Sequence, residues 1–162
     1  MKVSALNVAD VQIRRVGAAD VESLLPLCAA HAAYERLAYS AEGGVEELVQ
    51  ALAAAPPKLY AWIALNGDAA VGYASATLDF STLDRAPYLH MDCLFVRDGW
   101  RGRGVGRQLW RAVHAVACTL GCRTMQWQTP EWNVDAARFY KRLGATEMIK
   151  RRYVLPVTIA VS

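Results

Sequence analysis

The feature that most constrains the fold is a turn rich in glycine and arginine between a predicted strand and a predicted helix. Its six residues, 101–106, read Arg-Gly-Arg-Gly-Val-Gly. Glycines allow a tight turn and let backbone N–H groups come close to a ligand. The helix that follows adds unpaired N–H donors and the positive end of its dipole. The segment therefore predicts an anion site at the start of a helix.

The arginines of this segment strengthen that prediction. Four fall within residues 101–111, namely Arg101, Arg103, Arg107 and Arg111. The last three recur every four residues, so they share one helical face and repel one another by about 0.2–0.5 kcal/mol per pair. A polyphosphate ligand would remove that penalty, and a solvated basic turn is the simpler alternative. The segment is neither a Walker A loop nor a dinucleotide fingerprint, because Gly-Lys-Ser/Thr is absent and Arg107 replaces the third glycine.

Hydrophobic periodicity predicts a single α/β (or α+β) domain with a mixed sheet of about seven strands flanked by about four helices. Asn66-Gly67 between two strand-like runs is a strong hairpin signal. No repeat or linker interrupts the chain, so we expect one domain over 1–162, with an arm at 1–9 and a tail at 158–162. The expected strands cover residues 11–16, 59–65, 70–80, 88–96, 123–129, 145–148 and 151–157. The expected helices cover about 20–34, 45–54, 106–120 and 134–143.

Composition argues against several classes of protein. The four cysteines form no Cys-x-x-Cys pair and have no matching histidines, so neither a metal site nor a disulfide framework is expected. Residues 1–10 lack the apolar core of a signal peptide, and no apolar run could span a membrane, so we expect a cytoplasmic protein without a membrane partner. A nucleic-acid partner is not expected, because the net charge is only +3 and the arginine cluster contains no interleaved aromatic platform.

A second segment, residues 131–145, carries an informative pattern. It reads Glu-Trp-Asn-Val-Asp-Ala-Ala-Arg-Phe-Tyr-Lys-Arg-Leu-Gly-Ala, a short capped helix whose aromatic residues could simply belong to the core. Together with the first turn it resembles the GNAT superfamily of N-acetyltransferases. There a turn Arg/Gln-x-x-Gly-x-Gly/Ala precedes a helix with Asn…Ala…Phe-Tyr…Gly-Phe/Ala. The matching residues here are Arg101, Gly104, Gly106, Asn133, Ala136, Phe139, Tyr140, Gly144 and Ala145.

The resemblance implies acetyl-CoA as the cofactor, bound where two central strands splay apart. The strand end at 94–96 would pair with the pantetheine arm, and the amides of the 101–106 turn would hold the diphosphate. Residues around Asn133 would contact the cofactor from the other side. The cofactor-binding residues expected on this basis are Leu94, Phe95, Val96, Arg101, Gly102, Arg103, Gly104, Val105, Gly106, Arg107, Asn133, Ala136, Phe139, Tyr140 and Arg142.

Acetyl transfer to an amine needs a base and an acid, because the amine is mostly protonated at neutral pH and a thiolate leaves. The resemblance implies Tyr140 as the acid, since a phenol with an ordinary pKa of about 10 stays protonated. Asp92, which matches a glutamate of the spermidine/spermine branch, is the expected base, and His90 or an ordered water network are the alternatives. His90, two residues from Asp92 on a strand, should share its face, while Cys93 should point oppositely as an inert buried thiol. A backbone N–H near Leu94 could stabilise the oxyanion.

Within the superfamily the chain is most similar to the diamine/polyamine (spermidine/spermine-like) acetyltransferases. The similarity lies in residues 131–133 with 139–142, and in Tyr34 and Glu35 at the end of the first helix. It implies Tyr34, Glu35 and Asp92 as substrate-binding residues, and a homodimer. We expect the acceptor to be a small diamine, polyamine or lysine-like amine. The alternatives are a protein lysine or N-terminus, an aminoglycoside-like drug, or a non-catalytic acyl-CoA-binding sensor.

Overall fold

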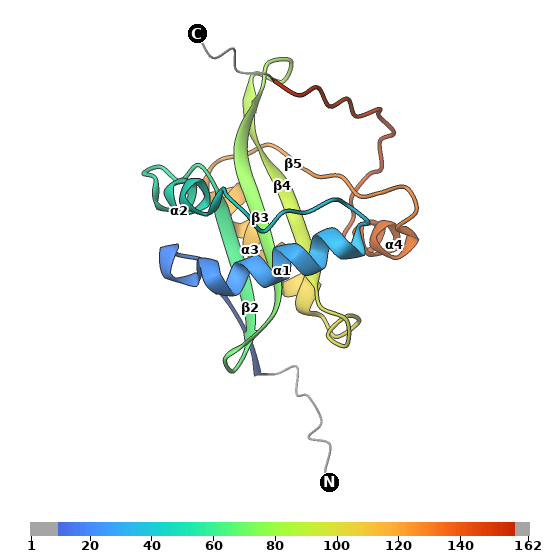
Figure 1. Ribbon diagram of the computed structural model, residues 1–162. Helices are drawn as coiled ribbons and strands as arrows, with labels where there is room; N and C mark the ends of the chain where they lie inside the picture. The colour runs from blue at the N-terminus through green and yellow to red at the C-terminus, as the bar shows by residue number, and fades with distance from the viewer. Residues whose placement is uncertain (1–9, 158–162) are drawn as a thin grey trace. The chain divides into compact units, whose positions relative to one another are not determined.

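The computed structural model describes residues 10–157, so the expected arm at 1–9 and tail at 158–162 lie outside the described residues (Figure 1). The chain divides into two compact units, one ending at Gln128 and the other beginning at Thr129. The first unit contains the sheet and three helices, and the second contains one helix. The single-domain organisation expected from the sequence stays a prediction.

The first unit is built on a five-stranded mixed sheet in the order β1-β2-β3-β4-β5. The first four strands are antiparallel neighbours, and β5 runs parallel to β4. The Asn-Gly signal predicted the β2–β3 hairpin correctly, and Gly67 has the positive φ of 58° that such turns require. The strands are β1 (Val11–Arg15), β2 (Tyr60–Asn66), β3 (Ala69–Ser81), β4 (Ala86–Val96) and β5 (Met125–Gln126).

Helices cover both faces of this sheet. In Figure 1, α1 (Val21–Tyr34) crosses the front face, while α3 (Val105–Thr119) lies behind it. The 3-10 turn η2 (Ala18–Asp20) leads into α1, and α2 (Val45–Ala53) comes after α1 in the chain. The apolar core on the α1 side includes Leu24, Leu27, Leu52, Ile63, Tyr73 and Phe95. The buried residues of α3 recur every four positions, as an amphipathic helix requires: Val105, Leu109, Val113 and Ala117.

The strand β3 passes close to both β4 and α3 at Gly72. A Cβ at this position would lie 2.8 Å from the carbonyl oxygen of Phe95 and 3.3 Å from Cδ1 of Leu109. The carbonyl is part of the β4 backbone, so it cannot move aside without disturbing the strand pair. A residue without a side chain therefore lets α3 approach the end of β4, where the candidate site begins.

The expected closing strands are wrong for the described part of the chain. Residues 145–148 and 151–157 form no strand, and the strand expected at 123–129 shortens to β5, so the sheet has five strands instead of about seven. Apolar side chains in this region are largely exposed, with Ile149 at 94% and Tyr153 at 84%. The preference of apolar residues for strands arises from the packing of their side chains on a sheet. Apolar residues that lack such packing therefore do not form a strand.

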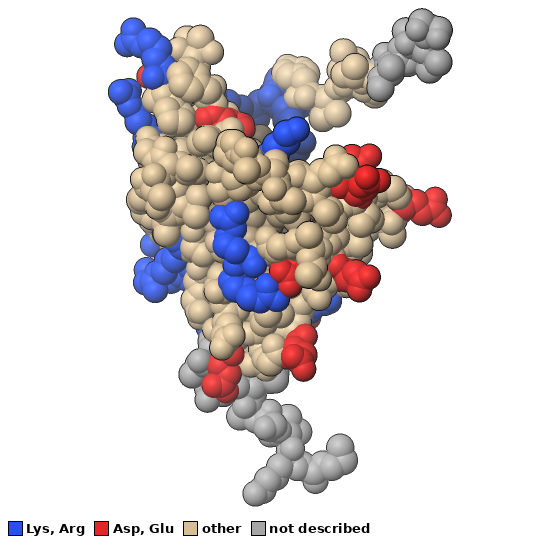
Figure 2. Space-filling view, turned by 90° about the vertical axis from the view of Figure 1, so that its left-hand side faces the viewer, with Lys and Arg blue, Asp and Glu red and all other residues tan. Residues whose placement is uncertain are grey.

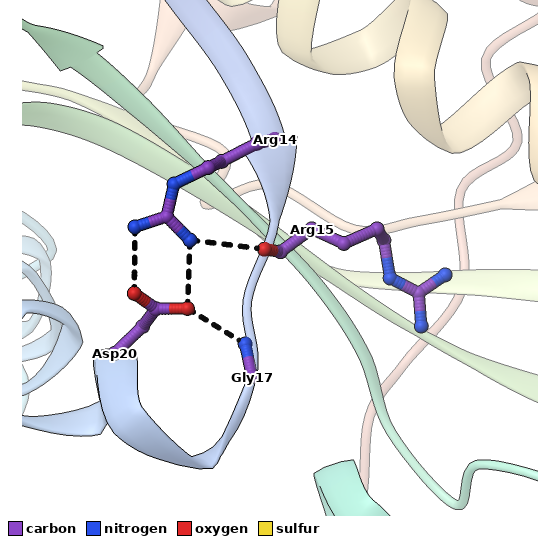
Figure 3. Close-up of polar contacts among 4 residues, drawn as sticks. All are labelled: Arg14, Arg15, Gly17 and Asp20. Atoms are coloured by element: carbon purple, nitrogen blue, oxygen red, sulfur yellow. Dashed lines mark hydrogen bonds and ion pairs between the residues drawn. The ribbon is translucent and has the colours of Figure 1, made fainter.

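A bidentate ion pair ties β1 to the start of α1. Arg14 donates from Nη2 to Oδ1 of Asp20 at 2.6 Å and from Nη1 to Oδ2 at 2.8 Å (Figure 3). The backbone N–H of Gly17 donates to Oδ2 at 2.8 Å. Hydrogen bonds from Arg14 first, and from Gly17 second, lower the pKa of Asp20 to about 2. Figure 2 views the molecule from the left-hand side of Figure 1. Basic side chains lie near the middle of this view, with acidic side chains beside them.

Replacing Asp20 by Asn tests this connection. The folded-state pKa of about 2 lies below the ordinary value of about 3.9, so the pair stabilises the fold above roughly pH 4 and loses its effect as the pH falls toward 2. Asp20→Asn should lower the free energy of unfolding by about 1 kcal/mol at pH 7, because Arg14 is half exposed and solvent screens the pair. Denaturant unfolding at both pH values measures the difference.

The control is Asp135→Asn, because the 3.6 Å pair between Asp135 and Arg138 has both side chains mostly exposed. It should change stability by less than about 0.5 kcal/mol at pH 7. The account of Asp20 fails if Asp20→Asn is as stable as the parent at pH 7, or if its deficit persists unchanged at pH 2.

Candidate functional site

The candidate site begins where β4 and β5 separate. These strands pair only at Leu89↔Met125 and His90↔Gln126, whereas β4 continues to Val96. Residues 91–96 pair with β3 on one side, and within the described residues no strand pairs with them on the other. This part of β4 is a sheet edge, whose N–H and C=O groups can pair with an extended ligand.

A β-bulge at Asp92 changes the direction of side chains along this edge. Ser75 pairs with Cys93 and Ala76 pairs with Met91, so Asp92 is the extra residue. The thiol of Cys93 donates to Oδ2 of Asp92 at 3.5 Å, which places the two side chains together. The expectation that they point to opposite faces is wrong, because it assumed the regular alternation that a bulge interrupts.

The two bulge residues have different surroundings. Asp92 is exposed, whereas burial first and the Asp92 carboxylate second raise the pKa of Cys93 to about 12. A thiol with that pKa stays protonated at neutral pH and is a weak nucleophile, as expected for an inert cysteine. His90 pairs with Thr77, two residues along β3 from Ser75, so His90 lies on the same face as Cys93 and Asp92, and the expectation that His90 shares the face of Asp92 agrees with this register.

The turn after β4 is fixed to β3 at its start and open at its end. Arg97 donates from its backbone N–H to the carbonyl of Val71 at 2.8 Å and from Nε to that of Ala70 at 3.0 Å. Gly102 and Gly104 have φ values of 71° and 85°, which favour glycine. A Cβ at either would meet no atom within 4 Å, so the space beside this turn can admit a ligand.

The turn ends at the N-terminus of α3. Gly104 is the N-cap and provides no side-chain cap, and the first backbone bond runs from the N–H of Gln108 to the Gly104 carbonyl at 3.1 Å. The N–H groups of residues 105–107 precede that bond, so the helix itself supplies no acceptor for them. Arg103 and Arg107 are exposed beside them. These features fit a diphosphate group.

Arg101 connects this turn to α1. Its Nε donates to the carbonyl of Val96 at 2.9 Å, and its guanidinium lies 4.1 Å from the ring centroid of Tyr34 and 5.7 Å from that of Phe95. Such cation–π contacts are favourable. The structure thereby brings together Arg101 and Phe95, expected at the cofactor, and Tyr34, expected at the substrate.

A polar network next to Phe95 was missed by sequence reasoning. Nδ1 of His31 lies 2.8 Å from the hydroxyl of Tyr73, and Nε2 lies 3.1 Å from Oε1 of Glu35. The imidazole stacks on Phe95 with ring centroids 5.2 Å apart. The four-residue spacing of His31 and Glu35 could have indicated their contact. Tyr73 comes from β3, and no local pattern connects it to α1.

Two thiols extend the network beneath the sheet edge. Burial first, and then the nearby thiols of Cys93 and Cys28, raise the pKa of Tyr73, whose hydroxyl lies within hydrogen-bonding reach of both. Burial also raises the pKa of Cys28. Polar side chains thus follow one another from Glu35 through His31 and Tyr73 to Cys93, whose own hydrogen goes to Asp92 at the bulge. Within residues 10–157 no histidine, cysteine, aspartate and glutamate side chains form a group of three able to hold a metal ion.

The second unit contains the helix that carries the other expected site residues, α4 (Val134–Arg142). Asn133 caps it, as predicted, with its Oδ1 accepting the N–H of Ala136 at 3.1 Å. Asn133 is buried, which suits this structural role. Phe139 and Tyr140 have ring centroids 5.4 Å apart. The helix and its cap are confirmed, while the roles of these residues toward a cofactor stay predictions.

Several curated proteins are similar to this chain. Aminoglycoside N(6')-acetyltransferase type 1 of Salmonella typhimurium is 31% identical over 113 residues, 68% of this chain and 73% of that protein. Thialysine N-epsilon-acetyltransferase of Bos taurus is 29% identical over 83 residues, 51% of this chain and 48% of that protein. An L-ornithine N5-acetyltransferase of Arabidopsis thaliana is 36% identical over 56 residues, 35% of this chain. The chain spans about half the length of the bovine relative and 25% of the Arabidopsis one.

Solved structures share the fold. An aminoglycoside acetyltransferase from an uncultured soil metagenomic sample, in complex with trehalose, has a TM-score of 0.79 at 19% identity, covering 92% of this chain and 98% of that one. An aminoglycoside N-acetyltransferase in complex with CoA has a TM-score of 0.72 at 25% identity, covering 91% and 100%. The family model described as "Acetyltransferase (GNAT) family" matches residues 27–145, which include β4, the glycine turn and α4. This chain therefore belongs to the GNAT acetyltransferase family.

Proposed function

We propose that the chain transfers the acetyl group of acetyl-CoA to a primary amine. The observation that carries the proposal is the continuity of two features within the first unit. The open edge of β4 at 91–96 leads directly into the turn that ends at Gly104 and the N-terminus of α3. An extended amide-containing arm suits the first feature, and a diphosphate suits the second. Coenzyme A contains both groups in one molecule.

Several backbone and side-chain groups of the chain would hold this cofactor. The backbone of residues 94–96 pairs with the pantetheine arm, and the amides of residues 102–106 bind the diphosphate. Arg103 and Arg107 add positive charge beside it. From the family pattern we propose Asn133, Ala136, Phe139, Tyr140 and Arg142 as further cofactor-binding residues. When bound, acetyl-CoA supplies the acetyl group as a thioester.

The chain's own residues handle the protons of the transfer. Asp92, exposed at the bulge, takes a proton from the substrate ammonium directly or through water, so that the neutral amine can attack. Tyr140 donates a proton to the departing thiolate, and a backbone N–H near Leu94 donates to the developing oxyanion. The balance is an ammonium and a thioester giving an amide, a thiol and one released proton.

We infer that the acceptor is a diamine, polyamine or lysine-like amine. The first unit holds two carboxylates, Glu35 and Asp92, at opposite ends of this series of polar side chains, and an amine with a second positive charge complements such a pair. The names of the relatives support this class, since thialysine, ornithine and aminoglycosides all carry more than one amine.

The organisation of the protein is also a proposal. The family match at 27–145 runs through the boundary at Gln128, which supports one domain over 1–162. We propose a homodimer from the family resemblance, and the cytoplasmic location expected from the sequence stays a prediction. Separately, no described helix combines the length and apolar character needed to cross a membrane.

An amine screen tests the proposed activity. Thiol release from acetyl-CoA is followed with putrescine, spermidine, lysine, its thia-analogue, an aminoglycoside and butylamine. We expect turnover with amines that carry a second positive charge, and a kcat/KM at least about tenfold lower for butylamine, the loss of about 1.4 kcal/mol of binding. Binding of acetyl-CoA without turnover on any amine would instead identify the chain as a sensor of acyl-CoA.

Gly104→Asp tests where the diphosphate binds. The substitution places a negative side chain at the helix N-terminus, so it should weaken acetyl-CoA binding at least about tenfold by calorimetry. The matched control is Gly121→Asp at the other end of α3. Gly121 also has a positive φ, 69° against 85°, and open space beside it, so both variants carry the same strain and charge. Equal effects on acetyl-CoA would contradict the assigned diphosphate site.

Tyr140→Phe tests the proposed acid. Removal of the phenolic O–H should lower kcat by about 10²–10⁴-fold while acetyl-CoA affinity stays within about twofold, because the proton is needed only in the transition state. Tyr153→Phe is the control, since Tyr153 lies in the same unit and is 84% exposed. Pre-steady-state turnover and calorimetry separate the two effects. Full turnover in Tyr140→Phe would remove this residue from the mechanism.

A further inference from the structure

We propose that His31 and Tyr73 are positioning residues that fix the Glu35 carboxylate to bind the second ammonium of a diamine-like acceptor. The inference rests on the proposed acetyl transfer to such amines and names the part of the chain that selects them. It concerns only residues of the first unit, in α1, β3 and the residue that follows α1.

The hydrogen bonds define how the network is oriented. A carboxylate only accepts, so the hydrogen on Nε2 of His31 points to Oε1 of Glu35, 3.1 Å away. In a neutral imidazole Nδ1 is then an acceptor, and the Tyr73 hydroxyl donates to it across 2.8 Å. Tyr73 is therefore the residue that fixes the tautomer in which His31 faces Glu35 as a donor.

Packing holds this donor in place. The imidazole stacks on Phe95 at 5.2 Å and meets the Tyr73 ring edge-on at 5.7 Å. The His31 side chain is 12% exposed and Tyr73 is 3% exposed, so neither ring is free to turn. Burying the polar groups of His31 and Tyr73 costs folding free energy unless they are fully hydrogen-bonded. Apolar side chains would fill the same space without that cost.

The Glu35 carboxylate is the accessible end of the network. Its side chain is 23% exposed, nearly twice the fraction of His31. The bond from His31 uses Oε1, and an ionised carboxylate has lone pairs on both oxygens, so Glu35 can accept from an ammonium while His31 still holds it. A flexible glutamate loses rotamer freedom when it binds a ligand, and a glutamate already held by His31 loses less.

The position of Glu35 suits an acceptor that is also bound at the sheet edge. Its neighbour Tyr34 lies 4.1 Å from Arg101, which in turn bonds to the end of β4. At the other end of the network, Cys93 bonds to Asp92. Buried, packed side chains thus lie between the two carboxylates of the first unit.

The test compares putrescine with butylamine, which has the same carbon chain and lacks the second amine. Tyr73→Phe keeps the ring and removes the donor to Nδ1, and His31→Leu removes the donor to Glu35. Each should raise KM for putrescine at least tenfold, with kcat and the KM for butylamine changed less than twofold. His31→Gln retains an amide donor near Glu35 and should restore part of the loss.

Tyr60→Phe is the matched control, because Tyr60 is another tyrosine buried in a central strand, at 7% exposure. It should leave both KM values unchanged. A purely structural role for the network predicts that His31→Leu and Tyr73→Phe impair putrescine and butylamine equally. Equal impairment, or an unchanged KM for putrescine in folded variants, overturns the proposal.

A binding measurement on the unmutated protein separates this inference from the proposed function and does not depend on variants that fold. With ¹⁵N-labelled histidine and bound CoA, putrescine should shift the ring nitrogens of His31 and butylamine should not; His31→Gln assigns the signals. Absence of a putrescine-specific shift overturns the inference even if turnover is normal. A shift without turnover on any amine supports the amine site and refutes the proposed activity.

Discussion

The close approach of β3 to β4 and α3 at Gly72 is the contact on which the candidate site depends. The absent side chain lets Leu109 of α3 pack directly over the sheet, next to the carbonyl of Phe95. The start of α3 is thereby held close to the last residues of β4. An open strand edge and a helix N-terminus are common features separately, and their juxtaposition at this contact makes them suitable for one long ligand with a peptide-like arm and a diphosphate.

The two carboxylates of the first unit are held by different means. Asp92 reaches the surface because a bulge inserts it into β4, and its bond to Cys93 connects it to the core. Glu35 follows the last turn of α1 and is held by a histidine whose other nitrogen faces Tyr73. Backbone irregularity thus places one carboxylate and side-chain packing places the other, while both belong to the same series of polar side chains. This arrangement makes α1 a part of the candidate site as well as a cover for the sheet.

The parts of the structure that follow from local sequence could be predicted, and those that depend on distant contacts could not. The β2–β3 turn, the glycine turn before α3 and the Asn133 cap of α4 each depend on a few adjacent residues, so the sequence predicted them correctly. The bulge at Asp92 depends on how β4 pairs with β3, and alternation along one strand cannot show it. The prediction of closing strands at 145–157 was wrong for a related reason. Their apolar pattern does not show whether a surface is present for them to pack against, and these side chains are exposed.

The open edge of β4 has a consequence for the protein when no ligand is bound. Unpaired N–H and C=O groups along a strand are a template for pairing with another chain, and such edges promote self-association. A ligand that occupies residues 91–96 also binds only the folded state, so it raises the free energy of unfolding in proportion to the logarithm of its concentration. The supply of such a ligand in the cell would then govern how long the chain survives as well as how fast it works.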